Sequence, residues 1–257
     1  MRLEQAVFTS IRGERLEGYQ LAARSPGIDE ELAKELTAWG PAHDSLWSDE
    51  GSINFHPLAG GRHGLSRTTL AGSEYSGRGG GRVYTQTIVL TAEGLAAFAN
   101  DPLLVLRAIA ASGRLLVYDQ LPAQLPTIPL LGRGREIARR WREEVVERVG
   151  REPFAELVET LASGGSATVA TDLPSERLFQ VVLWELAPAQ RLAVSFTTGL
   201  RPSSRRPFRL ATVPDDPALA RQSQRIQSGK VITLSRGVSE GGRALDNLTC
   251  AEFETVP

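Results

Sequence analysis

The sequence predicts an α+β fold of mixed, largely antiparallel sheets with packed helices, arranged in two halves. Three observations support this prediction. Short alternating apolar stretches are joined by short connections in the first 90 residues, capped helices are interleaved with them, and a proline- and glycine-rich stretch, 121–134, divides the chain. A chain of 257 residues can form one large domain or two modest ones.

The strands of the first half show apolar residues that alternate with polar ones between turn signals. In the stretch RVYTQTIVL, Val83 and Thr85 alternate with Tyr84 and Gln86 before the run becomes fully apolar. The expected strands are 5–12, 18–24, 51–57, 64–71 and 82–90. Because several neighbouring strands have short links, the pattern argues against a purely parallel, doubly wound sheet.

Helices in the first half are expected after residues that cap a helix N-terminus. The expected capping residues are Asp29, Thr91 and Asp101. Gly40-Pro41 ends the first helix, Pro102 stands at the first position of the third, and Gly113 ends it. The next stretch, 114–120 (RLLVYDQ), is expected to form a strand.

The stretch LPAQLPTIPLLGRG, 121–134, is interpreted as the seam between the halves. The prediction is an N-terminal α+β half, 1–125, and a C-terminal α+β half, 126–257, or one continuous domain. Helices are expected at 135–150, 153–162, 172–188 and 215–229, and strands at 166–172, 191–198, 207–213 and 230–235. The helix within 172–188 is apolar nearly all round, which predicts a buried central helix.

Composition and charge exclude several classes of protein. The formal charge of −1 and the pI near 6.4 give no overall attraction to nucleic acid or to an anionic membrane. The single cysteine, Cys250, excludes an internal disulfide and a cysteine-based zinc site. The start of the chain lacks the pattern of a signal peptide, and no run of 18 apolar residues occurs. We therefore expect a cytoplasmic protein.

The sequence contains no convincing catalytic, metal or cofactor motif. The stretch 76–82, SGRGGGR, lacks the ending of a phosphate-binding loop and precedes a strand, so a hairpin tip is expected there. The histidines His43, His56 and His63 match no metal-binding spacing. The acidic pairs stand at helix starts or one turn from arginines, where helix dipoles and ion pairs explain them. We expect no catalytic residue, no metal and no cofactor.

The stretch SFTTGLRPSSRRPFRL, 195–210, is the strongest candidate for a binding site. An apolar strand ends in Thr-Thr-Gly, four arginines follow, and a second strand begins. Guanidinium groups and hydroxyls suit phosphate or carboxylate recognition. The candidate partner- or anion-binding residues are Thr197, Thr198, Arg201, Arg205, Arg206 and Arg209. The alternative is a solvated loop, because arginine is frequent throughout: only Lys34 and Lys230 among the 29 basic residues are lysines.

Two stretches resemble the N-terminal domain of the bacterial GTPase-associated adaptor proteins. They are QAVFTSIRGERLEGYQLAARSPGIDEELAKEL at 5–36 and LWELAPAQRLAVSFTTGLRPSSRRPFRLATVPDD at 183–216. In the second stretch, the residues Ser195–Gly199 and Arg205–Arg209 carry the resemblance. One departure is the run LAPAQR, where the family pattern has a second leucine. Family members tend to be longer, so the chain is expected to be a stand-alone version or an N-terminal portion.

The resemblance implies a non-enzymatic adaptor that binds a protein partner, such as a small GTPase encoded nearby, in a bacterial defence or signalling system. The loop 201–209 and the segment 18–27 are the expected binding surfaces. The alternative is a sensor of a small anionic ligand or nucleotide that uses the same arginines. A third hypothesis, a hydrolase built on the region His43–His63, has the least support. The sequence leaves the oligomeric state open.

Overall fold

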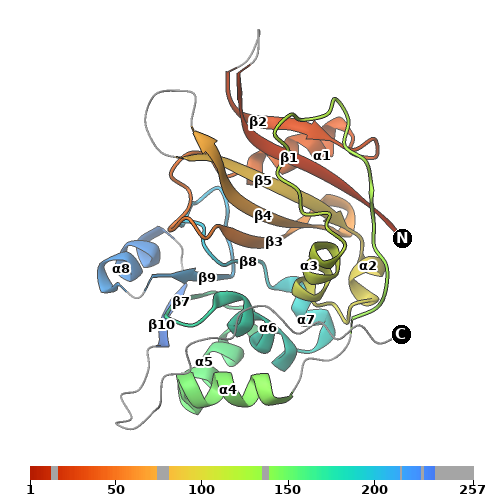
Figure 1. Ribbon diagram of the computed structural model, residues 1–257. Coiled ribbons are helices and arrows are strands. Elements are labelled where there is room, and N and C mark those ends of the chain that lie inside the picture. Colours follow the sequence, from red (N-terminus) through yellow and green to blue (C-terminus); the bar gives the residue numbers. More distant parts are fainter. Residues whose placement is uncertain (13–16, 74–80, 135–138, 215, 227–228, 235–257) are drawn as a thin grey trace.

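The computed structural model describes residues 1–12, 17–73, 81–134, 139–214, 216–226 and 229–234. Its strands form one mixed sheet in the order β10-β7-β9-β8-β3-β4-β5-β1-β2, with β6 paired to β1 outside this path. Helices cover both faces (Figure 1). The predicted α+β class with a largely antiparallel sheet is confirmed.

Residues from the first part of the chain form the antiparallel half of the sheet. Its strands are β1 (Arg2–Arg12), β2 (Glu17–Arg24), β3 (Ser52–Leu58), β4 (Arg62–Ser73) and β5 (Gly81–Leu90). These five strands were all expected from the sequence. The 3₁₀ turn η1 (Ala59–Gly61) joins β3 to β4, and its Gly60 has a φ of 69°. That left-handed backbone conformation favours glycine.

The second part of the chain forms the parallel half of the sheet. Its strands are β7 (Ala167–Thr171), β8 (Phe196–Thr197), β9 (Leu210–Val213) and β10 (Lys230–Leu234). β8 pairs in parallel with β9 and antiparallel with β3, where Asn54 lies opposite Thr197 and Phe55 opposite Phe196. This pairing makes the two halves of the sheet continuous.

The strand expected at 191–198 is mostly wrong. Residues Pro188–Ala193 form the short helix α7, and only Phe196 and Thr197 pair as a strand. Proline at the first helical position and a hydrogen bond of 3.1 Å from the Ala187 backbone N–H to Gln190 Oε1 stabilise the start of this helix. The local helix start prevails over the apolar pattern that follows it.

The remaining helices pack on opposite faces of the sheet. They are α1 (Glu30–Trp39), α2 (Ala92–Ala96), α3 (Pro102–Ala111), α4 (Arg139–Val149), α5 (Arg151–Ala162), α6 (Ser175–Glu185) and α8 (Pro217–Ile226). The three predicted capping residues each accept a hydrogen bond from the first turn of their helix. α1 and α8 lie on one face, and α3, α5 and α6 pack on the other (Figure 1).

The expected strand at 114–120 does not form. Both edges of β5 are already paired, with β1 and β4, so no edge of that strand is available. The segment instead crosses the sheet and is held by the side chain of Gln86. The Leu116 backbone N–H donates to Gln86 Oε1 at 3.1 Å, and Gln86 Nε2 donates to the Arg114 carbonyl at 3.1 Å. Further along, β6 (Ile128–Pro129) pairs with Arg2 and Leu3 of β1.

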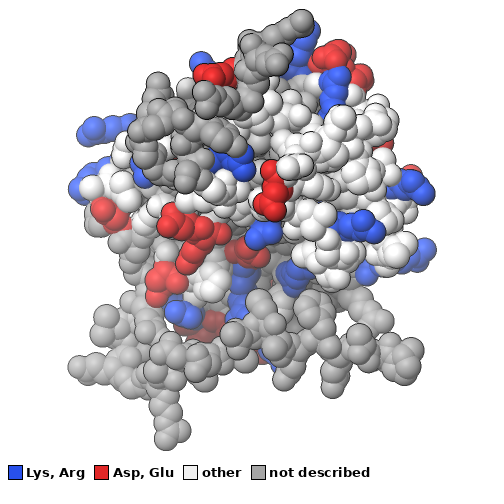
Figure 2. Space-filling model, turned by 45° about the horizontal axis from the view of Figure 1, so that its top comes forward, with Lys and Arg blue, Asp and Glu red and all other residues white. Residues whose placement is uncertain are grey.

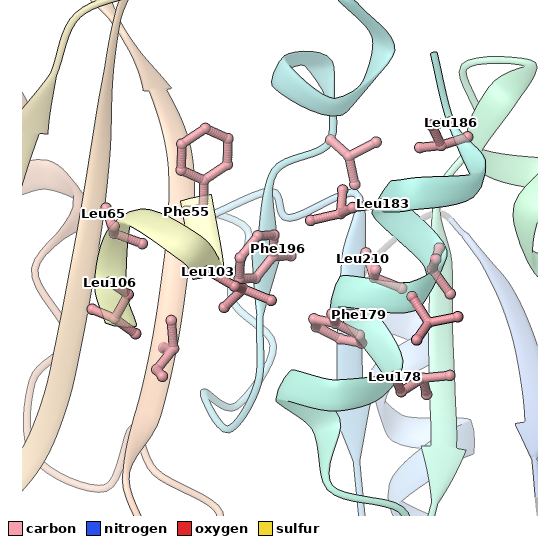
Figure 3. Close-up of a cluster of buried hydrophobic side chains, with 14 of the residues drawn as sticks. Phe55, Leu65, Leu103, Leu106, Leu178, Phe179, Leu183, Leu186, Phe196 and Leu210 are labelled. Carbon is pink, nitrogen blue, oxygen red and sulfur yellow. The ribbon is translucent and has the colours of Figure 1, made fainter. Parts of the chain in front are cut away.

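One large hydrophobic cluster contains residues from both parts of the chain. In Figure 3, leucines of α3 lie beside Phe55 and Leu65, α6 presents Phe179, and Phe196 lies between them. Phe179 and Phe196 meet edge to face with their ring centroids 5.5 Å apart. The buried side chains of α6 confirm the prediction of a central apolar helix.

Polar contacts also connect the two parts of the chain. Asp101 is completely buried, and its Oδ1 caps α3 by accepting from the backbone N–H groups of Leu103 and Leu104. Its Oδ2 accepts from Gln180 Nε2 at 2.7 Å and from Trp184 Nε1 at 2.6 Å. A single carboxylate therefore organises the start of α3 and binds two side chains of α6.

Candidate functional site

The arginine-rich loop follows β8 and lies against the segment that precedes β3. Arg201 donates from its backbone N–H to the Ser45 carbonyl at 2.7 Å and from Nε to the Leu46 carbonyl at 3.0 Å. Its guanidinium lies 4.9 Å from the ring centre of Trp47. Arg201 is exposed on its other side, so it both fixes the loop and contributes to the surface.

The neighbouring arginines of this loop differ in burial. Arg205 is exposed, whereas Arg206 is only 8% exposed and donates from Nη1 to the Gly40 carbonyl at 3.4 Å. Burial, and secondly the charge of Arg205, lowers the pKa of Arg206. The Nε of Arg206 has no hydrogen-bond partner among the described residues. Arg206 is therefore part of the packed base of the loop.

Arg209 donates to three backbone carbonyl groups, two at the end of α5 and one at the end of α7. Its Nε and Nη2 donate to the Gly165 carbonyl at 3.1 and 2.9 Å, and Nη2 also donates to the Leu161 carbonyl at 2.8 Å. Its Nη1 donates to the Ala193 carbonyl at 3.0 Å. A cation is favourable where α5 and α7 end, because carbonyl groups accumulate partial negative charge there. These bonds give Arg209 a sufficient structural role.

Thr197 belongs to a buried polar row that crosses β8, β3, β4 and β5, whereas Thr198 is half-buried and bonds to the backbone of β3. Thr197 Oγ1 donates to Asn54 Oδ1 at 2.6 Å and accepts from the Leu200 backbone N–H at 3.1 Å. Thr198 Oγ1 accepts from the Ile53 backbone N–H at 2.8 Å. The row continues from Asn54 through Ser66, Thr68 and Thr85. A cavity of about 10 Å³ beside it is near the smallest size that holds one water.

The six candidate residues therefore separate into two groups. Thr197, Thr198 and Arg209 direct their polar atoms to partners inside the fold, and Arg206 is buried at the base of the loop. Arg201 and Arg205 are exposed.

Two histidines of the sequence region 43–63, His56 and His63, are held by aromatic packing. His56 stacks on Trp39, with ring centroids 4.0 Å apart, and burial lowers its pKa to about 4. His63 stacks on Phe55 and contacts the Leu192 carbonyl through Nε2 at 3.2 Å; burial lowers its pKa too. His43 lies 3.3 Å from Asp44. Within the described residues, no three His, Cys, Asp or Glu side chains gather in a way that could hold a metal.

A charged cluster at the junction of β4, α3, α4 and α6 was not predicted. The guanidinium groups of Arg107 and Arg177 lie 5.2 and 5.3 Å from the ring centre of Trp141. Burial raises the pKa of Glu176, while the charges of Arg107 and Arg67 oppose that rise. The residues come from four different elements, with Glu176 and Arg177 adjacent on α6, so sequence spacing could not bring the cluster together. The available signal was Trp141, a large aromatic residue in a highly charged helix.

The consecutive helices α4 and α5 line an open groove of about 950 Å³, the α4–α5 groove. Its lining residues are Arg142, Glu143, Val146, Glu147, Gly150, Arg151, Phe154, Ala155, Val158, Glu159 and Glu185. Arg142 forms two hydrogen bonds to Glu185, at 2.5 and 3.2 Å, which raise the pKa of Arg142. On α4, Arg139 forms an ion pair with Glu143, one turn further along the helix, whereas Glu144 pairs with Arg177 of α6.

Comparison with known families gives one match. The model of the family described as GTPase-associated protein 1, N-terminal domain type 2, matches residues 2–130, half of the chain. The chain belongs to this family. No curated protein matches the chain.

The family match covers the antiparallel half of the sheet, from β1 to β6, together with α1, α2 and α3. It includes the first stretch on which the resemblance was based, 5–36, whereas the second, 183–216, lies beyond the matched residues. The arginine-rich loop and the α4–α5 groove also lie beyond it. No helix of the described residues has the length and apolar character needed to cross a membrane.

Proposed function

We propose that this chain is a non-enzymatic adaptor that holds a protein partner in a bacterial GTPase-associated system of defence or signalling. The family description supports the link to a GTPase. The observation that carries the adaptor role is a contrast between two places: the candidate ligand-binding residues are used inside the fold, whereas an apolar groove is left open on the surface. The polar groups of the threonines and of Arg209 are bonded within the fold, while the α4–α5 groove is open and has an apolar floor.

The surface charge is consistent with a protein partner. Basic and acidic side chains are interspersed on the face shown in Figure 2, and uncharged surface separates many of them. Exposed large apolar residues such as Leu116 and Val117 lie on the segment that crosses the sheet. Protein interfaces combine apolar area with a charged rim, whereas nucleic-acid interfaces need a concentration of positive charge. A cytoplasmic location accompanies this proposal.

The alternative proposal is a sensor of a small anionic ligand. The exposed guanidinium groups of Arg201 and Arg205 and the unpartnered Nε of Arg206 favour it. Calorimetric titration with inorganic phosphate and with GTP tests this alternative. Binding that is lost in Arg201→Glu/Arg205→Glu would support it, and no heat of binding with either ligand would exclude both as the ligand.

The adaptor proposal is tested with the proposed partner, a small GTPase, purified and loaded with GDP or a non-hydrolysable GTP analogue. Isothermal titration with the full chain is expected to show saturable binding to at least one nucleotide state. The chain alone is expected to hydrolyse no GTP. Absence of binding in both nucleotide states would contradict the adaptor proposal for this GTPase.

A further inference from the structure

We infer that the α4–α5 groove binds a basic amphipathic helix of a partner protein, an inference that rests on the proposed adaptor function. Val145, Val149 and Leu157 face the core, whereas Val146 and Val158 are only half-buried, although they lie on the same two helices. Together with Ala155 they form an apolar floor that the fold leaves open. Figure 1 shows this helix pair at the end of the molecule away from the β1–β2 hairpin.

The dimensions of the groove suit a short helix. The lining runs from Arg142 on α4 to Gly150, the residue that separates α4 from α5, which corresponds to about 12 Å at the rise of an α-helix. Apolar anchors at positions i, i+4 and i+7 of a docked helix span about 10.5 Å, so three anchors fit along the floor. A third helix laid between two others packs by the same ridges and grooves as helices in a protein core.

An extended peptide fits this site less well. Its backbone N–H and carbonyl groups need partners, but the walls of the groove are helices whose backbone groups bond within each helix. A helix satisfies its own backbone and needs only side-chain contacts. The outer edges of β2 and β10 are the places where the sheet could accept an extended strand.

The charge of the rim selects a basic partner. Four glutamates and two arginines line the groove, and Arg142 is engaged by Glu185. Glu147 lies on the α4 wall and Glu159 on the α5 wall, and neither forms an ion pair with another described residue. Lysine or arginine residues beside the apolar anchors would neutralise both carboxylates.

The test uses two fluorescent 15-residue peptides with the same leucines at i, i+4 and i+7 and either lysines or glutamates at the flanking positions. Their binding to the full chain is measured by fluorescence anisotropy. We expect the lysine peptide to bind at least tenfold more tightly than the glutamate peptide. Equal affinity of the two peptides, or no binding of the lysine peptide, would overturn the inference.

Two pairs of variants locate the binding. Ala155→Trp fills the floor without a change of charge; because Ala155 is exposed, the fold tolerates it, and Ala110→Trp on exposed α3 surface is its control. The double variant Glu147→Gln/Glu159→Gln removes two negative charges from the rim of the groove. Its control, Glu93→Gln/Glu152→Gln, removes two negative charges outside the groove lining. We expect at least a tenfold loss of lysine-peptide affinity in each groove variant and unchanged affinity in each control. Affinity retained by Ala155→Trp would overturn the assignment.

The same variants separate this inference from the adaptor proposal. A GTPase that binds wild type and Ala155→Trp equally would leave the adaptor proposal in place and place its surface outside the groove. Specific binding of the lysine peptide without any binding of the GTPase would keep the groove assignment and contradict the GTPase as partner.

Discussion

Replacement of Asp101 is expected to weaken the connection between the two parts of the chain. The carboxylate is fully buried and accepts four hydrogen bonds. In Asp101→Ala, loss of the helix cap costs about 1 kcal/mol. The stranded donors of Gln180 and Trp184 cost about 1–3 kcal/mol each. We therefore expect a loss of about 4 kcal/mol in the free energy of unfolding, which corresponds to a fall of about 10 °C in Tm.

The assay is urea unfolding followed by far-UV circular dichroism and tryptophan fluorescence. Asp101→Asn keeps an acceptor for the helix cap, so its expected loss is smaller, about 2–3 kcal/mol. The control is Asp119→Ala on the exposed segment that crosses the sheet, with an expected change within about 0.5 kcal/mol. A loss of about 1 kcal/mol or less in Asp101→Ala would refute the reasoning, because the cap alone accounts for that amount.

Three further predictions concern pH, packing and Arg209. Burial lowers the pKa of His56 from 6.5 to about 4 in the folded state. The free energy of unfolding should therefore be highest above pH 6.5 and fall by about 3 kcal/mol as the pH drops toward 4, because the unfolded state binds the proton first. Unfolding curves of His56→Phe should lack this part of the pH dependence. Gly199→Ala should lose about 1–3 kcal/mol by thermal melting, because the new Cβ would lie 2.4 Å from the Gly51 carbonyl oxygen; an unchanged Tm would show that this approach can relax. Arg209→Ala should lose about 2–3 kcal/mol by urea unfolding while peptide binding to the α4–α5 groove is retained, and unchanged stability would contradict its structural role.

Local chemistry made much of the fold predictable from the sequence. The strands of the antiparallel half are joined by short connections, and their pattern of alternation is visible within each segment. Asp29, Thr91 and Asp101 each have a side chain that accepts from the helix they begin, so these helix starts could be recognised without tertiary information.

The errors arose where tertiary pairing decides the structure. The segment 114–120 has the composition of a strand, but β5 has no unpaired edge to receive it. In 191–198, a local helix start and the two-residue pairing of β8 overrode the apolar pattern. The residues of each segment do not show that the edges of β5 are occupied or that β8 pairs over only two residues.

The candidate site shows the same limit. The sequence shows that Arg209 lies near other arginines, but it does not show that three carbonyl groups, from the ends of α5 and α7, converge on its guanidinium. The α4–α5 groove depends on the separation of two helices, and the half-exposed positions Val146 and Val158 resemble ordinary core positions in the sequence. The carbonyl site of Arg209 and the α4–α5 groove both depend on how helices and strands pack together. The hydrophobic periodicity of a single helix or strand gives no information on that packing.

The most direct test of the account, in which the adaptor holds its GTPase through the α4–α5 groove, is a competition measurement. The full chain is bound to the proposed partner, a small GTPase, in its binding-competent nucleotide state, and the lysine peptide is added to increasing concentration. The account predicts that the peptide displaces the GTPase, with a matching loss of both interactions in Ala155→Trp. A GTPase that stays bound while the peptide saturates the groove would contradict the groove as the adaptor surface, because the two would then occupy different surfaces.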